Sequence, residues 1–209
     1  MRFAVTGTDT GVGKTVFCAA LAGALGANYW KPVQSGLEGE TDSETARRLS
    51  GLSQDRILPE AYRLKLPASP HISAAREGIR IEASRLTIPR RPGPLVIEGA
   101  GGLMVPLAPD LLQIDVFASW GLPVILCAPT SLGTINHTLL SLEAMARRAI
   151  AVHGVVFTGE PGEDVESTIT ALGKTRRLGR LPPLDPLNAG TLADAFRAHC
   201  RLSDFSAQS

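Results

Sequence analysis

Short and almost continuously apolar runs recur along the chain and predict the strands of a buried sheet. Strands that are covered on both faces, as in a parallel sheet, are apolar throughout, whereas a half-exposed strand alternates with polar positions. Loops that contain glycine and longer stretches with helical spacing separate these runs. The predicted strands cover residues 2–6, 28–30, 94–98, 123–128 and 154–158.

Three of the intervening stretches, residues 15–25, 43–51 and 136–149, predict helices. In the third, Leu139 and Met145 fall on one apolar face, as expected for a helix packed on a sheet. The repeated order of strand, loop and helix predicts an α/β fold. We expect a mostly parallel central sheet flanked by helices on both faces.

The chain shows no internal repeat and no low-complexity linker, so residues 1–209 are predicted to form a single domain. The Pro- and Gly-rich segment 89–94 indicates a turn before a strand and not a domain boundary. The polar tail over about 201–209 is expected to fray.

Composition and charge exclude several classes of protein. The 21 basic and 20 acidic residues almost cancel, which predicts neither nucleic acid nor a membrane surface as a partner. Cys18, Cys127 and Cys200 are odd in number and lack metal-ligand spacing, as is typical of a reducing compartment. There is no secretion signal and no long apolar run, so the sequence predicts a cytoplasmic protein.

The segment "GTDTGVGKT" at residues 7–15 lies directly after the first strand and before the first helix. Glycines there turn backbone N–H groups inward at a helix N-terminus, which favours phosphate. Lys14 is placed to reach the β- and γ-phosphates and Thr15 to bind magnesium, so the fold is predicted to be P-loop NTPase-like. The predicted nucleotide-binding residues of this segment and of the position after it are Gly11, Val12, Gly13, Lys14, Thr15 and Val16.

Two observations qualify this motif. Five residues separate Gly7 from Gly13, whereas the usual pattern has four, so a glycine-rich turn with an accidental Gly-Lys-Thr is the alternative. A second copy, "LGKT" at 172–175, has no glycine-bearing loop after a strand, and we interpret it as a helix end with Gly173 as a C-cap.

The carboxyl ends of parallel strands share one edge of the sheet, where such folds bind ligands. Lys31 follows the second strand and is either a solvated loop charge or an anion-facing cation. Glu98 ends a buried strand, which is costly unless the carboxylate is paired or binds a metal, so it is a magnesium candidate. Asp42 is a second magnesium candidate or a helix N-cap.

Further residues at this edge suit a ligand. The glycines of "EGAGG" let the backbone approach a bound molecule, which adds Gly99, Ala100 and Gly101 to the predicted nucleotide site. Gly133 and Asn136 begin a helix whose N-terminus suits a substrate carboxylate. His71 and His137 have no visible partner, and we assign them structural polar roles.

Taken together, these segments resemble those of the dethiobiotin synthetase family. The similarity rests on "GTDTGVGKT", "KPVQSG", "SPHISAA", "EGAGGLMVP" and "LGTINH", which occur in the family's order over roughly the first two-thirds of the chain. The family's loop has the same five-residue spacing, so the resemblance implies that the extra residue is a family trait.

The resemblance implies an ATP-dependent ligase of biotin synthesis that acts on 7,8-diaminopelargonic acid and CO₂ or bicarbonate. One amine becomes a carbamate, which attacks the γ-phosphate to give a carbamic–phosphoric anhydride. The second amine then closes the ring, and ADP and phosphate are released. Lys31 and Lys14 would be the catalytic residues, and Thr15, Asp42 and Glu98 would hold Mg²⁺.

The resemblance also implies how the substrate is bound. Ser35, Lys31 and Pro70 would lie against it. The family is a homodimer with its substrate at the interface, so Gly133 and Asn136 would reach the substrate carboxylate from the partner subunit.

One departure concerns the nucleotide base. Thr158 stands where many family members carry an asparagine that reads the adenine edge, and a hydroxyl cannot make the paired contact of an amide. Another nucleotide, such as CTP, is therefore a possible co-substrate. The rest of the predicted base site consists of Gly159, Leu181, Pro182 and Pro183.

Three alternatives share the phosphate site. A dimeric switch ATPase of the partitioning or division-site-positioning type carries an additional lysine early in its loop, and the segment Gly7–Thr10 has none. Related amidoligases commonly attach a glutamine-using domain, for which 209 residues leave no space. A small-molecule kinase would not require both "EGAGG" and "LGTINH".

Overall fold

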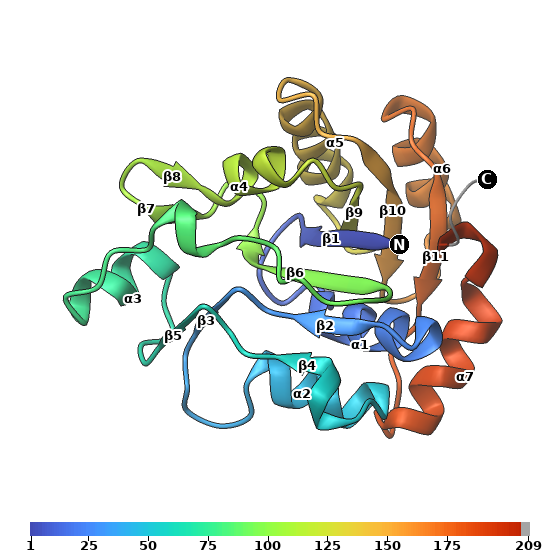
Figure 1. Ribbon diagram of the computed structural model, residues 1–209. Coiled ribbons are helices and arrows are strands. Elements are labelled where there is room, and N and C mark those ends of the chain that lie inside the picture. The colour runs from blue at the N-terminus through green and yellow to red at the C-terminus, as the bar shows by residue number, and fades with distance from the viewer. Residues whose placement is uncertain (206–209) are drawn as a thin grey trace.

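Seven parallel strands form the central sheet of the computed structural model, which describes residues 1–205 (Figure 1). Their order across the sheet is β11-β10-β9-β1-β6-β2-β4. The predicted α/β fold with a parallel sheet is therefore confirmed. The strands are β1 (Arg2–Gly7), β2 (Asn28–Trp30), β4 (Ile57–Leu58), β6 (Leu95–Gly102), β9 (Val124–Pro129), β10 (Val152–Thr158) and β11 (Arg177–Leu181).

Helices cover both faces of this sheet, as predicted (Figure 1). Phe3 and Val5 of β1 pack into one apolar cluster with α1, α2 and α7, whereas Ala4 packs into another with α4, α5 and α6. This alternation explains why the strands are apolar throughout, because each face meets a helix layer. The helices are α1 (Lys14–Leu25), α2 (Asp42–Ser50), α4 (Gln113–Trp120), α5 (Thr134–Ala146), α6 (Glu163–Leu172) and α7 (Ala189–His199).

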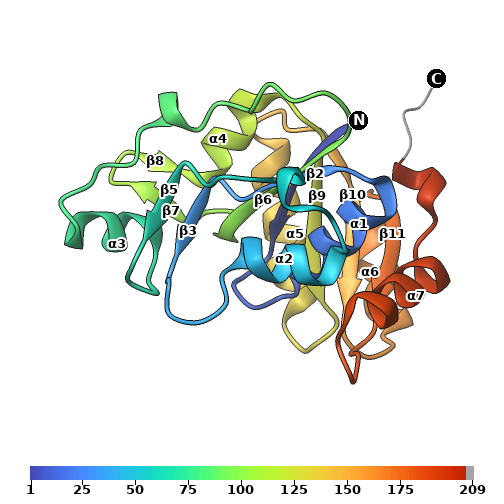
Figure 2. The same cartoon turned by 60° about the horizontal axis from the view of Figure 1, so that its bottom comes forward.

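A smaller group of elements lies beyond the carboxyl ends of β2 and β6 (Figures 1 and 2). It consists of two short two-stranded sheets and one short helix. These elements border the edge of the large sheet at which we predict ligand binding. They are β3 (Val33–Ser35), paired with β5 (Tyr62–Leu64), then α3 (Pro70–Arg76), and β7 (Pro106–Ala108), paired with β8 (Leu111–Leu112).

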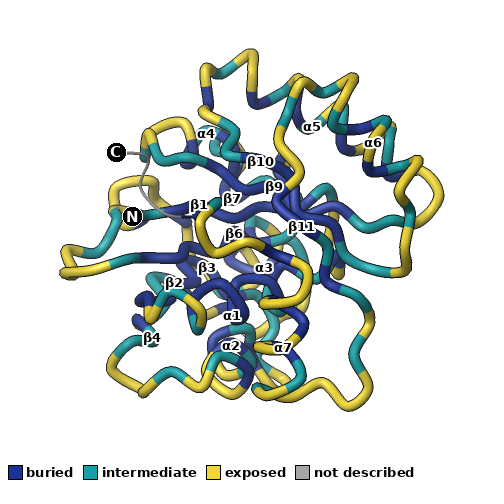
Figure 3. Tube along the Cα trace, turned by 90° about the vertical axis from the view of Figure 1, so that its right-hand side faces the viewer, coloured by how far each residue is buried: buried dark blue, intermediate teal, exposed yellow. Residues whose placement is uncertain are grey.

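The buried residues follow the central strands and the inner faces of the helices (Figure 3). The last described residues lie against this core. Phe205 is fully buried in the short 3₁₀ helix Leu202–Phe205 and lies 6.2 Å from Phe3, ring centroid to ring centroid. The predicted fraying is therefore wrong for 202–205, because the aromatic side chain anchors this segment. Residues 206–209 lie outside the described part of the chain.

The second "GKT" copy ends a helix, as predicted. α6 stops at Leu172, and Gly173 is its C-cap. Gly173 has φ −76°, so its conformation does not require glycine. Packing requires glycine here, because a Cβ would lie 2.7 Å from the backbone oxygen of Ile169 and 2.4 Å from Leu142 Cδ1 of α5.

Candidate active site

The predicted phosphate loop connects β1 to α1 at the carboxyl edge of the sheet. Gly13 has φ +83°, a left-handed conformation that side chains rarely adopt, and is the N-cap of α1. The first turn of α1 thus presents its free N–H groups to the loop. The Lys14 side chain folds back, and its Nζ donates to Asp9 O at 2.8 Å. Burial and the neighbouring charge of Lys31 lower the pKa of Lys14.

Three oxygen-bearing side chains meet beside this loop. Thr15 Oγ1 lies 2.8 Å from Glu98 Oε1 and 3.2 Å from Asp42 Oδ1. Asp42 is the first residue of α2 and not its cap. Thr41 is the N-cap and forms a capping box with Glu44. The capping role considered for Asp42 is therefore wrong, and its carboxylate is free to face the site.

Lys31 lies between these carboxylates and is not a solvated loop charge. Its Nζ is 2.6 Å from Asp42 Oδ2 and 3.0 Å from Glu98 Oε1, and it donates to Gly99 O at 3.1 Å. The residue follows β2 in a loop, as predicted, but only 3% of its surface is exposed. Burial favours the neutral amine, yet the charges of Glu98 and Asp42 outweigh it and raise the pKa of Lys31.

Burial and neighbouring charges also act in opposite directions on the pKa of Asp42. Burial acts to raise the pKa of this carboxyl group, but the charge of Lys31 and hydrogen bonds from Lys31 and Thr15 outweigh burial and lower it. Lys31 and Asp42 thus stabilise each other in their ionised forms. The result is a buried cation held next to the phosphate loop by two carboxylates.

A pocket of about 480 Å³ opens beside Lys31. Its walls come from β3, from the segment that leads into α3 and from the end of β6. The hydroxyl oxygen of Ser35 is buried and has no hydrogen-bond partner. Predicted site residues that line this pocket are Lys31, Ser35, Asp42, Pro70, Ala100 and Gly101.

Gly99 does not line this pocket, and its lack of a side chain has a packing reason. A Cβ at this position would lie 2.7 Å from Phe117 Cζ of α4. The backbone carbonyl of Gly99 faces the site and accepts the hydrogen bond from Lys31. This glycine is therefore needed for the approach of a helix, which sequence reasoning did not foresee.

A second, smaller pocket of about 180 Å³ gathers the predicted base-binding residues. Thr158 donates from Oγ1 to Val12 O of the phosphate loop at 2.9 Å. Its hydroxyl proton is thus used within the protein. The pocket is lined by Gly13, Val16, Thr158, Gly159, Leu181, Pro182 and Pro183, and also by Leu184 and Leu187, which sequence reasoning missed.

Gly133 and Asn136 lie apart from both pockets. Gly133 is the N-cap of α5, and both residues are exposed. They start a helix at the carboxyl end of β9, as predicted, but they line neither pocket of this chain. Of the two histidines, His71 contacts the Ser69 hydroxyl, with 3.0 Å between Nδ1 and Oγ, and His137 is exposed on α5.

Tyr29 is a site residue that sequence reasoning missed. Its hydroxyl group donates to Glu98 Oε2 at 2.8 Å, from a fully buried position. Burial and the charge of Glu98 raise the pKa of Tyr29 well above its ordinary value, so the phenol stays protonated. In the sequence, Tyr29 is one apolar residue in the strand "NYW", and no signal indicates its partner.

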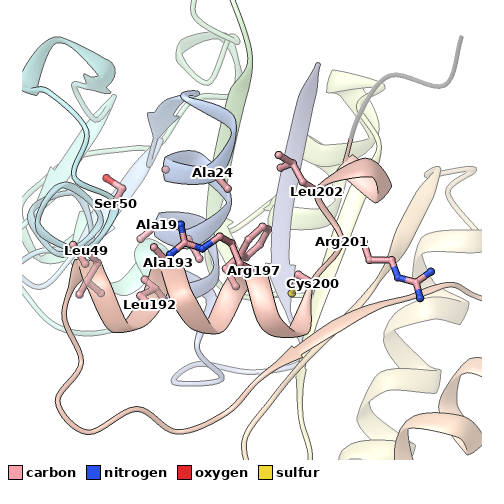
Figure 4. A pocket seen from close by; sticks show the side chains of 14 residues that line it. Ala19, Ala24, Leu49, Ser50, Leu192, Ala193, Arg197, Cys200, Arg201 and Leu202 are labelled. Atoms are coloured by element: carbon pink, nitrogen blue, oxygen red, sulfur yellow. The ribbon is translucent and has the colours of Figure 1, made fainter.

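A cavity of about 540 Å³ lies elsewhere, between α1, α2 and α7 (Figure 4). Its lining is mostly alanine, leucine and other apolar side chains, and it also includes Arg197 and Arg201. None of the predicted site residues lines it. No helix in the described part of the chain is long and apolar enough to cross a membrane.

Sequence comparison finds proteins similar to this chain. A family model described as an AAA domain matches residues 1–191. The chain is 62% identical to an ATP-dependent dethiobiotin synthetase BioD of Agrobacterium fabrum (strain C58), over 98% of this chain and 97% of that protein. It is 61% identical to the protein of the same name from Rhodopseudomonas palustris (strain TIE-1), over 98% and 96%.

Solved structures with low sequence identity share the fold. A ParA family ATPase from Chlorobium tepidum superposes with a TM-score of 0.54 at 12% identity, over 100% of this chain and 93% of that one. The MinC:MinD cell division complex of Aquifex aeolicus gives a TM-score of 0.53 at 13% identity, over 100% and 98%. The near full-length identity to the synthetases is far higher, and this chain belongs to the dethiobiotin synthetase family.

Proposed function

We propose that this chain synthesises dethiobiotin from 7,8-diaminopelargonic acid, CO₂ and ATP, with release of ADP and phosphate. One observation carries the proposal. The pocket beside Lys31 contacts the same lysine and Asp42 that adjoin the phosphate loop, so a substrate there would lie next to the terminal phosphate of a bound nucleotide. The names of the close relatives support this reaction.

In this mechanism the substrate occupies the pocket with its two amines toward Lys31. One amine adds to CO₂ and loses a proton, giving a carbamate. The carbamate oxygen attacks the γ-phosphorus and ADP departs, leaving a carbamic–phosphoric anhydride. The second amine attacks the carbamate carbon, loses a proton and expels phosphate, which closes the ring. The buried ammonium of Lys31 stabilises the negative charge of the carbamate and of the phosphoryl oxygens.

The residues present fit a magnesium ion. The Thr15 hydroxyl oxygen lies within hydrogen-bond distance of one carboxylate oxygen of Asp42 and one of Glu98, and such oxygens are the hard ligands that Mg²⁺ prefers. Within residues 1–205, no group of three or more His, Cys, Asp or Glu side chains could hold a metal. Magnesium commonly binds one or two carboxylates together with nucleotide phosphates. When bound, Mg²⁺ supplies charge neutralisation at the phosphates.

The nucleotide would extend from the phosphate loop into the smaller pocket. Lys14 and the N-terminus of α1 would bind the β- and γ-phosphates. The base would lie among Thr158, Gly159 and Leu181. Since the Thr158 hydroxyl proton is donated to Val12, this side chain offers the base an acceptor only, so we include CTP as a possible co-substrate.

We further propose a homodimer in which Gly133 and Asn136 reach the substrate of the partner subunit. In their own chain these residues are exposed and line no pocket of the site. Large apolar side chains flank them, because Leu132 precedes Gly133 and Leu140 lies one helical turn beyond Asn136, and both leucines are exposed. Exposed apolar side chains around polar ones are typical of an interface.

The protein is proposed to act in the cytoplasm. Cys18, Cys127 and Cys200 are free and buried, as in proteins of reducing compartments.

The test combines purified protein, Mg²⁺, bicarbonate and 7,8-diaminopelargonic acid with ATP or CTP. Phosphate release is followed together with the cyclic urea product, which mass spectrometry identifies. Product that depends on all components supports the proposal. Nucleotide hydrolysis without product would contradict it and favour a switch ATPase or another ligase with the same phosphate site.

A further inference from the structure

The phenol of Tyr29 lies inside the protein, directly behind the predicted magnesium site. Tyr29 is in β2, paired with Val96 of β6 on one side and Ile57 of β4 on the other. It is fully buried, and a buried tyrosine hydroxyl group that loses its partner is costly. Its partner is Glu98 Oε2, at 2.8 Å.

The two oxygens of Glu98 therefore have different surroundings. Oε2 receives the hydrogen bond of Tyr29 from the core side. Oε1 lies 2.8 Å from Thr15 Oγ1 and 3.0 Å from Lys31 Nζ, on the side of the phosphate loop. A rotation of this carboxylate that moved Oε1 away from the site would also break the bond to Tyr29.

Tyr29 shares an apolar cluster with the helices that carry the other predicted ligands. It belongs to the apolar cluster that contains Phe17 of α1 and Leu49 of α2. α1 begins at Lys14, next to Thr15, and α2 begins at Asp42. One buried side chain thus belongs to the same apolar cluster as these helices, while its hydroxyl group contacts the third predicted ligand.

We propose that Tyr29 is a positioning residue for magnesium, which fixes Glu98 so that Oε1 is presented to the metal beside Thr15 and Asp42. The inference rests on the proposed magnesium site. It concerns a residue that touches neither nucleotide nor substrate. Hydrogen bonds to the ligands of a metal typically change its affinity by about 10–100-fold.

The experiment measures equilibrium binding of a fluorescent ATP analogue while Mg²⁺ is varied, without turnover. Tyr29→Phe removes only the hydroxyl group. We expect the half-saturating Mg²⁺ concentration to rise about tenfold, with unchanged affinity for the analogue in EDTA. Tyr62→Phe is the matched control, since the other tyrosine of the chain is also buried and its hydroxyl accepts from Glu82 N at 3.0 Å. It should leave the Mg²⁺ dependence unchanged.

Glu98→Gln separates this inference from the site on which it rests. If Glu98→Gln raises the Mg²⁺ requirement and Tyr29→Phe does not, the role of Tyr29 is overturned. If neither variant changes it, the magnesium site itself is wrong. Equal effects of Tyr29→Phe and Tyr62→Phe would also overturn the inference, because they would indicate a general loss of packing.

A second measurement keeps Tyr29 in place and does not depend on the folding of Tyr29→Phe. In the Tyr62→Phe variant Tyr29 is the only tyrosine of the chain, so 3-fluorotyrosine labels it alone. Adding Mg²⁺ to the protein saturated with the ATP analogue should shift the ¹⁹F resonance, because the metal binds to the carboxylate that the phenol contacts. A resonance that does not move would overturn the inference.

Discussion

Lys31 Nζ lies 2.6 Å from Asp42 Oδ2, and the pair is held at the base of a pocket next to the phosphate loop. Glu98 completes the cluster and is fully buried. The sequence predicts a lysine whose loss leaves the fold intact, since it lies in a loop. Its burial between two carboxylates changes that expectation.

Lys31→Ala is expected to abolish product formation and also to destabilise the protein. The substitution leaves the buried charge of Glu98 without its cation, and breaking a buried ion pair in this way costs about 3–5 kcal/mol. The free energy of unfolding from urea titrations measures this loss. Lys65→Ala is the control, because Lys65 is an exposed lysine after β5 and its loss should change stability by less than about 0.5 kcal/mol.

The double variant Lys31→Ala/Glu98→Gln tests the cause of the destabilisation. It removes the unpaired charge, so it should recover part of the stability while remaining inactive. Wild-type turnover in Lys31→Ala would contradict the catalytic role of Lys31, and wild-type stability would contradict the ion-pair argument.

The two Gly-Lys-Thr segments of the chain provide a second prediction. Lys14→Ala should weaken nucleotide binding by about tenfold or more, because a charge-assisted contact to phosphate is lost. Lys174→Ala should leave nucleotide affinity unchanged, since Lys174 is exposed after the end of α6, away from the phosphate loop. Isothermal titration with a non-hydrolysable ATP analogue compares the two, and similar losses would mean that the second copy also binds nucleotide.

The strands were predictable from the sequence where apolar residues dominate a segment. β1, β6, β9 and β10 are largely apolar because helices cover both of their faces, so their pattern is strong. β11 was missed because its sequence "RLGRL" contains two arginines and a glycine and lies at the edge of the sheet. α7 was missed as well, because its buried face is narrow and includes only Leu192, Ala195 and Phe196.

The site was predictable where local spacing determines it. The phosphate loop is continuous in sequence, so its lysine and threonine are recognised together. The environment of Lys31 depends on the N-terminus of α2 and on the end of β6, which only the folded chain brings together. The same holds for the bond between Thr158 and Val12, whose positions are 146 residues apart.

That bond leads to a prediction about the nucleotide base. Thr158→Asn restores an amide, which offers both a donor and an acceptor to adenine, so the ratio of kcat/KM for ATP to that for CTP should rise. Thr158→Val is the control, because it removes the bond to Val12 without adding an amide. An unchanged ratio in Thr158→Asn would mean that the base is read elsewhere.

His153 should make stability depend on pH. Burial lowers the pKa of His153 below its ordinary value of 6.5, although the hydrogen bond to Asp204 O acts the other way. The unfolded chain then binds a proton more readily than the folded chain. The contribution to stability is fully present above the ordinary value and is lost as the pH falls through the lowered pKa of the folded state.

The difference between wild type and His153→Phe isolates this effect. Phenylalanine cannot be protonated and retains an aromatic ring beside Phe3, whose ring centroid lies 4.7 Å from that of His153. Between about pH 7.5 and about pH 5.5, the free energy of unfolding should fall further for wild type than for the variant. Equal falls, measured by urea titration, would show that His153 does not titrate in this way.

Leu132 tests the proposed dimer. Its side chain is fully exposed beside Gly133, and a glutamate there would place a charge in the predicted interface, where an unpaired charge is costly. Leu132→Glu should shift the mass measured by light scattering from dimer to monomer and reduce turnover, because Gly133 and Asn136 would no longer reach the partner's substrate. Leu172→Glu, at the exposed end of α6, is the control and should change neither. A wild-type protein that is already monomeric and fully active would contradict the shared site.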